Sequence, residues 1–256
     1  MASFETVGSK EKAIAIIESS GNKQKDKDKA KEIIQNTRSI VSVLCKSSKR
    51  KGKLRKREYT LIAGNKNTEV NHKEYGFLIK VDPQKTYFSP RELTERQRIA
   101  KQVKKNEKVL VLFSGVGPFA LAIKKKVPTS QVYGIELNKA AHKYAMENKK
   151  LNRVSDIQFL QGDVRKVIPK LKFDRILMPL PETAYTFLDI AFKKINKEGI
   201  IHYYTWGKKE EYRKIKEQIK EEAKKQKKKI RIIRIKGVLP YAPKVYKIAV
   251  DLKVLN

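Results

Sequence analysis

The sequence is poor in the residues that build disulfide-linked or zinc-dependent proteins. It has one cysteine, Cys45, and three histidines in 256 residues. A single cysteine excludes an internal disulfide framework and a cysteine-based zinc site, and it indicates a reducing, intracellular setting. The histidines are scattered without metal-ligand spacing, so we expect no bound metal.

Long apolar runs are also absent. No stretch reaches the roughly 18 apolar residues that a membrane-spanning helix needs. The first twenty residues carry acidic groups and lack the apolar segment of a signal peptide. We therefore expect a cytoplasmic protein that makes no membrane contact, and we expect it to act as a monomer.

Acidic residues are scarce relative to basic ones, with 27 Asp and Glu against 60 Lys and Arg and a net charge of +33. Such a field attracts polyanions, which makes nucleic acid the first partner to consider. The alternative is a solvated, lysine-rich surface of the kind found in heat-adapted proteins. Residues 46–57 contain eight basic residues in twelve, and residues 224–236 contain eight in thirteen. From the first cluster we predict five RNA-binding side chains: Lys49, Arg50, Lys51, Lys53 and Arg57.

The first 91 residues mix short apolar runs with dense charge, which is typical of a small α+β domain. We predict strands at Ala13–Ile17, Ile40–Leu44 and Tyr59–Ile62, a helix at Lys27–Gln35, and a hairpin of Glu69–His72 with Tyr75–Val81. We expect this domain, residues 1–91, to contact RNA.

Residues 92–256 alternate regularly between strand and helix patterns. A helix from Glu92 to Val103 leads into Val109–Phe113, a continuous apolar run typical of a strand buried on both faces. Strands are predicted at Gln131–Glu136, Ile157–Leu160, Arg175–Met178, Gly199–Tyr204, Ile230–Ile235 and Val245–Leu252, with helices at Pro118–Lys126, Lys139–Leu151, Val164–Leu171, Glu182–Ile195 and Lys208–Lys227. This pattern predicts a Rossmann-like α/β domain with a doubly wound parallel sheet and an antiparallel edge from the last strands.

A glycine turn, Phe113-Ser-Gly-Val-Gly-Pro-Phe-Ala120, follows the first buried strand and opens a helix. This is where a doubly wound sheet binds a nucleotide, and Gly115 and Gly117 allow the backbone to approach a ligand closely. The string also fits the dinucleotide pattern G-x-G-x-x-A. Pro118, however, removes an N–H that a pyrophosphate would use. The turn therefore favours a cofactor without phosphates.

Two acids follow the next two predicted strands. Glu136 can accept hydrogen bonds from both ribose hydroxyls of an adenosine, and Asp163 can accept one from an adenine amino group. Together with the proline-ended turn, these acids point to S-adenosylmethionine. The alternative is that each acid is an ordinary helix N-cap.

Several blocks resemble the tRNA (guanine-37 N1)-methyltransferases of archaea and eukaryotes. They are Tyr87-Phe-Ser-Pro-Arg91, Glu95-Arg96, the glycine turn, Met178-Pro-Leu-Pro181, Ile201-His-Tyr-Tyr204 and residues 54–64. The resemblance covers nearly the whole chain. It implies a class I methyltransferase fold, S-adenosylmethionine as cofactor, and methylation of the tRNA base that follows the anticodon.

The resemblance also implies roles for individual residues. Glu95 would remove the N1 proton of guanine as general base, and Arg55, or else Arg57, would stabilise charge on O6. Tyr87 would stack on the extruded base, with Pro179 beside it. The implied cofactor contacts are Phe88, Ser89, Arg96, Phe113, Ser114, Gly115, Gly117, Phe119, Glu136, Leu137, Asp163, Val164, Pro179 and Pro181. His202 is placed near the ligand edge and assigned to RNA binding.

Two features depart from the family pattern. Many members have Asn-Leu-Pro or Asn-Pro-Pro where this chain has Pro179-Leu-Pro181, and proline has neither a side-chain amide nor a backbone N–H to hold guanine. The variant resembles the archaeal type-a branch, whose bifunctional members also methylate C7 of 4-demethylwyosine. In addition, the chain begins at what resembles the second domain of longer members. The sequence leaves open how overall tRNA shape is recognised, and the basic clusters are candidates to compensate.

Two other functions remain open at this point. One is aminocarboxypropyl transfer in the wyosine pathway, which uses the same cofactor. The other is RNA binding without catalysis on a methyltransferase fold, which the glycine turn and both acids disfavour.

Overall fold

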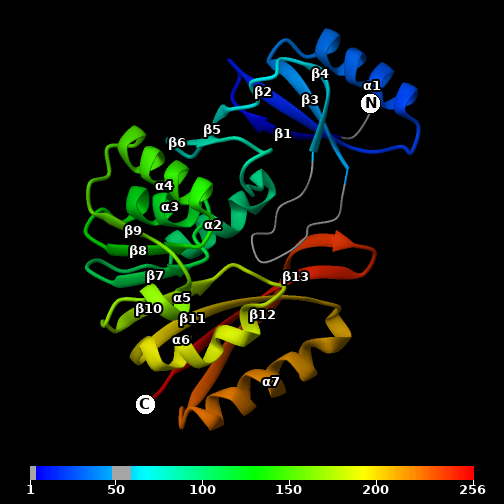
Figure 1. Cartoon of the computed structure of the whole chain (residues 1–256). Coiled ribbons are helices and arrows are strands. Elements are labelled where there is room, and N and C mark those ends of the chain that lie inside the picture. The colour runs from blue at the N-terminus through cyan, green and yellow to red at the C-terminus, as the bar shows by residue number, and fades with distance from the viewer. Residues whose placement is uncertain (1–3, 48–58) are drawn as a thin grey trace. The chain divides into compact units, whose positions relative to one another are not determined.

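The computed structural model describes residues 4–47 and 59–256 (Figure 1). The chain forms two compact units. The N-terminal unit runs to Leu93 and includes Gly115–Pro118 and Asn138–Arg153. The C-terminal unit comprises Thr94–Ser114, Phe119–Leu137 and Val154–Asn256. The domain boundary after residue 91 stays a prediction.

The N-terminal unit contains a four-stranded sheet in the order β1-β2-β3-β4. Its elements are β1 (Glu5–Gly8), β2 (Ala13–Glu18), α1 (Lys23–Asn36), β3 (Ile40–Lys46) and β4 (Tyr59–Gly64). The strands β2 and β3 pair in parallel through the crossover helix α1, whereas both outer pairs are antiparallel. Alternating apolar residues of β2 and β3 pack against Ala30 and Ile33 of α1 to form the core of this sheet. The predicted small α+β unit is thus observed.

A hairpin and a helix complete the N-terminal unit. The hairpin joins β5 (Val70–Glu74) to β6 (Phe77–Val81), and the helix is α4 (Lys139–Leu151). Asn148 and Asn152 of this segment lie four residues apart, and their side-chain amides bind the backbone of Leu78 and Lys80 as a neighbouring strand would. The free edge of β6 is therefore capped by asparagine side chains.

The C-terminal unit is built on a seven-stranded sheet in the order β12-β13-β11-β10-β7-β8-β9. Its strands are β7 (Lys108–Leu112), β8 (Gln131–Glu136), β9 (Ile157–Gln161), β10 (Phe173–Met178), β11 (Ile195–Gly207), β12 (Ile230–Ala242) and β13 (Val245–Val254). Five neighbouring strands, β9, β8, β7, β10 and β11, are parallel, and β13 and β12 add an antiparallel edge. This arrangement confirms the predicted doubly wound sheet.

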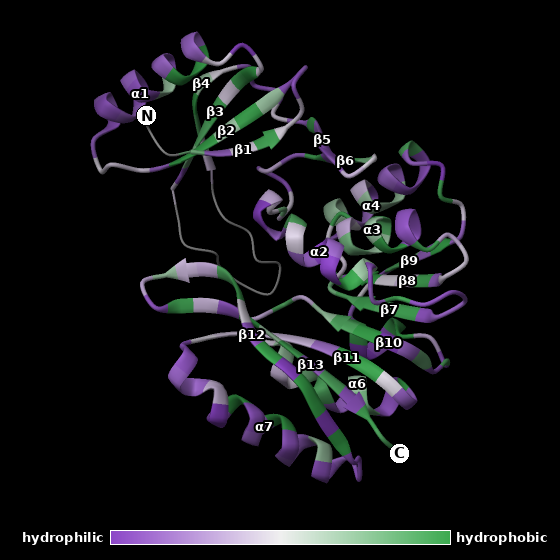
Figure 2. Ribbon diagram, turned by 180° about the vertical axis from the view of Figure 1, so that it is seen from behind, coloured by the Kyte–Doolittle hydropathy of each residue, from purple (hydrophilic) through white to green (hydrophobic). Residues whose placement is uncertain are grey.

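Helices complete the C-terminal unit. They are α2 (Leu93–Ala100), α3 (Pro118–Lys126), α5 (Val164–Val167), α6 (Leu188–Lys194) and α7 (Tyr212–Lys225), with short 3-10 turns at Ala184–Phe187 and Lys209–Glu211. The first residues of α2 and α3, and a further 3-10 turn at Pro90–Glu92, belong to the N-terminal unit. The helix α7 is hydrophilic along most of its length (Figure 2), and it buries Ile215, Ile219 and Ala223, which share one face because they are four residues apart.

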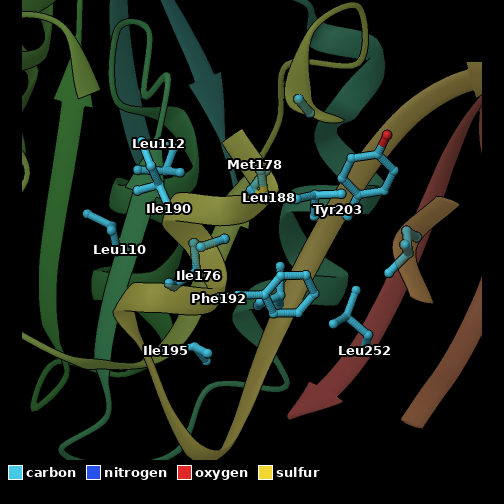
Figure 3. Packing of buried hydrophobic residues seen from close by; sticks show 14 of the residues in the cluster. Leu110, Leu112, Ile176, Met178, Leu188, Ile190, Phe192, Ile195, Tyr203 and Leu252 are labelled. Carbon is cyan, nitrogen blue, oxygen red and sulfur yellow. The ribbon is translucent and has the colours of Figure 1, made fainter. Parts of the chain in front are cut away.

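The core of the C-terminal unit lies between α6 and the central strands. Leu110 and Leu112 of β7, Ile176 and Met178 of β10, and Phe192 of α6 belong to one buried cluster (Figure 3). The apolar run that predicted β7 is almost fully buried, as expected for a strand covered on both faces.

Candidate active site

The carboxyl ends of three neighbouring parallel strands carry the residues predicted to bind a cofactor. Strand β7 pairs with β8, and β8 pairs with β9, so their ends share one edge of the sheet. Ser114 follows β7, Glu136 ends β8, and Asp163 follows β9. The C-terminal unit thus brings together one hydroxyl and two carboxylates on the edge where open α/β sheets bind ligands.

The glycine turn has an unusual backbone. Phe113 has a φ of 57°, Gly115 one of 57° and Gly117 one of 89°, all in the left-handed region. Among residues 4–47 and 59–256, a Cβ added at Gly115 would meet nothing closer than the carbonyl oxygen of Tyr87 at 3.9 Å. These residues therefore do not fill the space beside Gly115, which fits the close approach of a ligand.

Asn148 holds this turn in place within the N-terminal unit. Its Nδ2 donates to the carbonyl oxygen of Val116 at 3.0 Å and to that of Lys80 at 3.0 Å, while its Oδ1 accepts from the Lys80 N–H at 2.6 Å. The side chain is fully buried. One neutral amide therefore couples the glycine turn to strand β6.

Ser114 is the strongest indication that a polar ligand belongs at the end of β7. Its Oγ is buried and has no hydrogen-bond partner among the described residues, although the Ser114 N–H donates to the Ile135 carbonyl at 2.9 Å. A buried hydroxyl without a partner is costly. Together with the carboxylates of Glu136 and Asp163, it forms a donor and acceptor set that suits the neutral polar groups of an adenosine.

Asp163 has a second, structural role. Its Oδ1 accepts from the Arg165 N–H at 2.9 Å and caps α5, as the N-cap interpretation predicted. Glu136 is half-buried, and its carbonyl oxygen accepts from the Gly162 N–H at 2.9 Å. The turn after β9 is therefore fixed to the end of β8, which keeps the two acids on neighbouring strands.

Aromatic residues line the same edge. Phe113 packs edge-on against Phe187 with ring centroids 4.8 Å apart, and the Arg165 guanidinium lies 5.0 Å from the Phe187 centroid. Pro179 and Leu180, after β10, are half-buried, and Pro181 is buried. The predicted contacts Phe119 and Val164 are buried, Val164 in the hydrophobic core, while Leu137 is 39% exposed.

Glu95, the predicted general base, lies in a network of buried charges in the C-terminal unit. Its carboxylate is clamped by Arg98, with Nε to Oε2 at 2.8 Å and Nη2 to Oε1 at 2.7 Å, and Tyr204 donates its hydroxyl to Oε1 at 2.6 Å. Arg98 also binds Asp251, with Nη1 to Oδ2 at 2.5 Å. Arg98 has its pKa raised because these two carboxylates outweigh the effect of burial, and Arg98 in turn helps to lower the pKa of Asp251.

His202 extends the network in its neutral form. Its Nε2 lies 2.7 Å from Nη1 of Arg175, which can only donate, so Nε2 is the acceptor and Nδ1 carries the proton. Nδ1 then donates to Oδ1 of Asp251 at 2.6 Å. Burial lowers the pKa of His202, and the facing guanidinium of Arg175 adds to this effect. Arg175 is anchored by Glu107 through Nε at 2.9 Å.

This placement corrects one prediction. His202 is completely buried and both its ring nitrogens are engaged, so its side chain is not available to RNA in this structure. The prediction of an RNA-binding histidine was wrong because the cross-strand pairing of His202 with Asp251 cannot be read from the local sequence.

The predicted Tyr87, Phe88 and Ser89 lie in the N-terminal unit. Tyr87 donates its hydroxyl to Glu92 Oε1 at 3.3 Å, and Phe88 packs edge-on against His72 with centroids 5.1 Å apart. Arg96 belongs to the C-terminal unit and is 1% exposed. The predicted Arg55 and the five RNA-binding residues Lys49, Arg50, Lys51, Lys53 and Arg57 lie outside the described residues.

Residues 70–233 match the family model described as the TRM5/TYW2 methyltransferase domain. The chain belongs to this family. Family membership confirms the predicted resemblance and the predicted class of enzyme, and the TRM5/TYW2 fold agrees with the observed sheet.

Three relatives show how far the similarity extends. The Pyrococcus abyssi tRNA (guanine(37)-N(1))-methyltransferase Trm5b is 39% identical over 254 residues, which is 98% of this chain and 74% of that protein. Its crystal structure superposes with a TM-score of 0.88, at 37% identity, over 99% of this chain and 75% of that one. A Methanocaldococcus jannaschii tRNA(Phe) (4-demethylwyosine(37)-C(7)) aminocarboxypropyltransferase is 33% identical over 90% of this chain and 92% of that protein. The structure of M. jannaschii TYW2 with AdoMet superposes with a TM-score of 0.75, at 27% identity, over 99% of this chain and all of that one.

Sequence reasoning missed several residues that contact the predicted site residues of this TRM5/TYW2 protein. Arg98 and Asp251 contact each other across 153 positions, and no local pattern announces such a pair. Asn148 did leave a signal, because two asparagines four residues apart near the end of a helix are unfavourable unless their amides are used.

Among the described residues, no group of three or more His, Cys, Asp and Glu could hold a metal ion. Within the same residues, no helix is long and apolar enough to cross a membrane.

Proposed function

We propose that this TRM5/TYW2 protein transfers the methyl group of S-adenosylmethionine to N1 of guanine at position 37 of tRNA. The observation that carries the proposal is the pair of carboxylates, Glu136 and Asp163, at the ends of neighbouring parallel strands, on the same edge of the sheet as Ser114, which follows β7. The names of the P. abyssi relative and of the TYW2 complex with AdoMet support the reaction and the cofactor.

The residues at the sheet edge fit an adenosyl group. The Glu136 carboxylate is assigned to the ribose hydroxyls, and Asp163 Oδ2 to the adenine amino group, since Oδ1 caps α5. Ser114 Oγ is a buried hydroxyl to which the ligand can offer a partner. Gly115 and Gly117 have positive φ values, which allow a close approach of the ligand to the backbone. The apolar cofactor contacts that the proposal assigns to the C-terminal unit are Phe113, Phe119, Leu137, Val164, Pro179 and Pro181. S-Adenosylmethionine, when bound, supplies an electrophilic methyl group.

The reaction requires a base because N1 of guanine carries a proton. Glu95 accepts that proton, so that the N1 lone pair can form the new bond to the methyl carbon. The cofactor's sulfur would keep the electron pair of the bond that is broken, so that the transfer balances. Arg55, or Arg57, stabilises the charge that gathers on O6, and Tyr87 stacks on the extruded base.

The partner in this proposal is tRNA. A net charge of +33 and the basic cluster at residues 46–57 supply phosphate contacts that position the RNA without reading its sequence. Action as a monomer in the cytoplasm remains part of the proposal.

Aminocarboxypropyl transfer is a second candidate reaction, and 4-demethylwyosine is a second candidate base. This chain spans 92% of the aminocarboxypropyltransferase of M. jannaschii, an enzyme whose name indicates another group transferred to the same tRNA position. In addition, Pro179 lacks the amide that would hold guanine, so 4-demethylwyosine is a second candidate base, methylated at C7.

The test is to incubate the purified protein with S-adenosylmethionine and three tRNAs that carry guanosine, adenosine or 4-demethylwyosine at position 37. Nucleoside mass analysis then identifies the product, because methyl transfer adds about 14 Da and aminocarboxypropyl transfer about 101 Da. We expect methylated guanosine and no product with adenosine. A gain of aminocarboxypropyl, or cofactor binding without any modified nucleoside, would overturn the proposal.

A further inference from the structure

The contacts of Glu95 pose a chemical problem for a general base. A carboxylate bound by both arms of a guanidinium is well oriented, but a full positive charge beside it makes it a weak base. Arg98 contacts Glu95 in this bidentate manner. In the network around Arg98, Glu95 stays oriented by the guanidinium while a second carboxylate, Asp251, takes part of the guanidinium's charge.

Arg98 divides its donors between two carboxylates. Nε and Nη2 reach Glu95, whereas Nη1 reaches Asp251 Oδ2 at 2.5 Å and Nη2 also reaches Asp251 Oδ1 at 3.1 Å. Asp251 therefore takes part of the positive charge that would otherwise act on Glu95 alone. The side chain of Asp251 is 5% exposed and that of Arg98 is 18% exposed, so water screens these interactions little.

Asp251 is itself immobilised from the other side. It lies opposite His202 in the antiparallel pairing of β13 with β11, and His202 Nδ1–H donates to its Oδ1. Tyr204, two residues along β11 and on the same face, donates to Glu95 Oε1 and has its ring 4.7 Å from Lys247 Nζ. His202 and Tyr204, two residues apart on β11, thus hold Asp251 and Glu95, the two carboxylates that Arg98 contacts.

We propose that Arg98 is a positioning residue for Glu95, with Asp251 and His202 holding its guanidinium and sharing its charge. The inference rests on the proposed function, in which Glu95 takes the proton. A displacement of about 1 Å at a reacting group costs on the order of 100-fold in rate, which gives this clamp a direct effect on turnover without contact with either substrate.

The experiment is a double-mutant cycle on the single-turnover rate, with Asp251→Asn and Glu95→Gln alone and combined. We expect Glu95→Gln to lower the rate by about 100- to 1,000-fold, and Asp251→Asn by about 10- to 100-fold. Dissociation constants for S-adenosylmethionine and for tRNA should change less than about twofold. In the Glu95→Gln background, Asp251→Asn should have no further effect, because its action passes through the base.

A matched control is available on the same two strands. Glu198 of β11 forms an ion pair with Lys253 of β13 at 2.5 Å, outside the network. Glu198→Gln should leave the rate within about twofold in both backgrounds. If Glu95→Gln leaves only a trace of activity, Glu95→Asp serves as the second background, and if Asp251→Asn does not fold, Arg98→Lys replaces it.

The outcomes separate the two proposals. A normal rate in Glu95→Gln overturns the role of Glu95 and, with it, the role of Arg98. A slow Glu95→Gln with a normal Asp251→Asn overturns the positioning role alone. An equal loss from Asp251→Asn in both backgrounds shows a general structural effect and also overturns it.

Discussion

Buried polar groups hold a segment of the proposed site in each unit of the molecule. In the N-terminal unit they are the side chains of Asn148 and Asn152, and in the C-terminal unit they form the network around Arg98. The asparagines use neutral amides, which bind the backbone of β6 and, through Asn148, the glycine turn at Val116. The network uses two guanidinium groups, two carboxylates and a neutral imidazole to hold Glu95.

The difference follows from what each segment needs. A glycine turn only has to keep its backbone in place, and a neutral amide achieves this without the cost of burying a charge. A general base has to be ionised and oriented at once, and only charged partners act on both properties. The neutral cluster should therefore be insensitive to pH, whereas the charged network should lose stability in acid.

The largest expected loss of stability comes from placing a charge in the neutral cluster, which is formed by Asn148, Asn152 and the backbone groups that they bind. Asn148→Asp would aim a carboxylate at the carbonyl oxygens of Val116 and Lys80, where Asn148 now donates. We expect the free energy of unfolding at pH 8 to fall by about 3–5 kcal/mol, since an unpaired buried charge costs this much. Part of the loss should return as the pH falls, because a protonated carboxyl can donate again. Urea titrations at several pH values measure both effects.

Asn71→Asp is the control for that experiment. Asn71 is an exposed residue of β5 in the same unit, so the same change of side chain should alter the free energy of unfolding by no more than about 0.5 kcal/mol. An Asn148→Asp protein as stable as Asn71→Asp would show that the amide contacts contribute nothing, and the comparison between the clusters would fail.

A smaller effect is expected at the turn that Asn148 holds. Gly115→Ala has room for its Cβ, with only the Tyr87 carbonyl at 3.9 Å, but the added carbon occupies the space assigned to the cofactor. We expect the dissociation constant for S-adenosylmethionine, measured by equilibrium dialysis, to rise about tenfold, or roughly 1.4 kcal/mol.

Gly21→Ala is the control for the stability that is lost when alanine adopts a positive φ. Gly21 also has a positive φ, +82°, and nothing lies within 4 Å of a Cβ added there. Both variants pay the cost of an alanine in the left-handed region, about 1 kcal/mol of stability, but Gly21→Ala should bind the cofactor normally. Equal cofactor affinity in the two variants would remove Gly115 from the cofactor site.

Local patterns predicted the elements that depend on local sequence. The apolar run of β7, the glycine turn, α3 and α4 were all placed within a residue or two of their observed bounds. Other elements end earlier than predicted, for reasons that lie in their own local sequence or backbone. Phe113 leaves β7 with a φ of 57°, and the helix predicted to reach Leu171 ends at Val167, because Pro169 follows two residues later and restricts the residue before it. The strand Glu5–Gly8 was missed, since only Val7 of its four residues is buried.

The site was less predictable than the fold because it depends on pairs that are distant in the sequence. Glu136 and Asp163 could be placed on one edge by counting strands. By contrast, the Asp251 clamp on Arg98 needs the register of β11 against β13, and no periodicity encodes it. Glu95 could thus be named from the family resemblance, but the groups that hold it could not.

The smallest expected effect is a change in the pH dependence of stability at His202, and it tests the contrast between the charged network and the neutral asparagines directly. Burial and Arg175 lower its pKa in the folded protein below the ordinary value of 6.5, so the unfolded chain binds a proton first as the pH falls. The stability contributed by neutral His202 is therefore full above pH 6.5 and declines as the pH falls below it. Asp251, whose pKa is also lowered, adds a second loss only below its ordinary value of 3.8.

His202→Gln tests this assignment because glutamine cannot titrate. Its Oε1 can accept from Arg175 and its Nε2 can donate to Asp251, as the neutral imidazole does. Thermal unfolding between pH 7.5 and pH 5 should show a smaller decline of the melting temperature in the variant than in the wild type, whereas Asn148→Ala, which leaves the charged network intact, should keep the wild-type slope. Parallel curves for wild type and His202→Gln would mean that folding does not lower the pKa of His202. A wild-type curve that gains on the variant toward pH 5 would mean that the imidazole is charged in the folded protein, and the neutral tautomer inferred from the Arg175 contact would have to be abandoned.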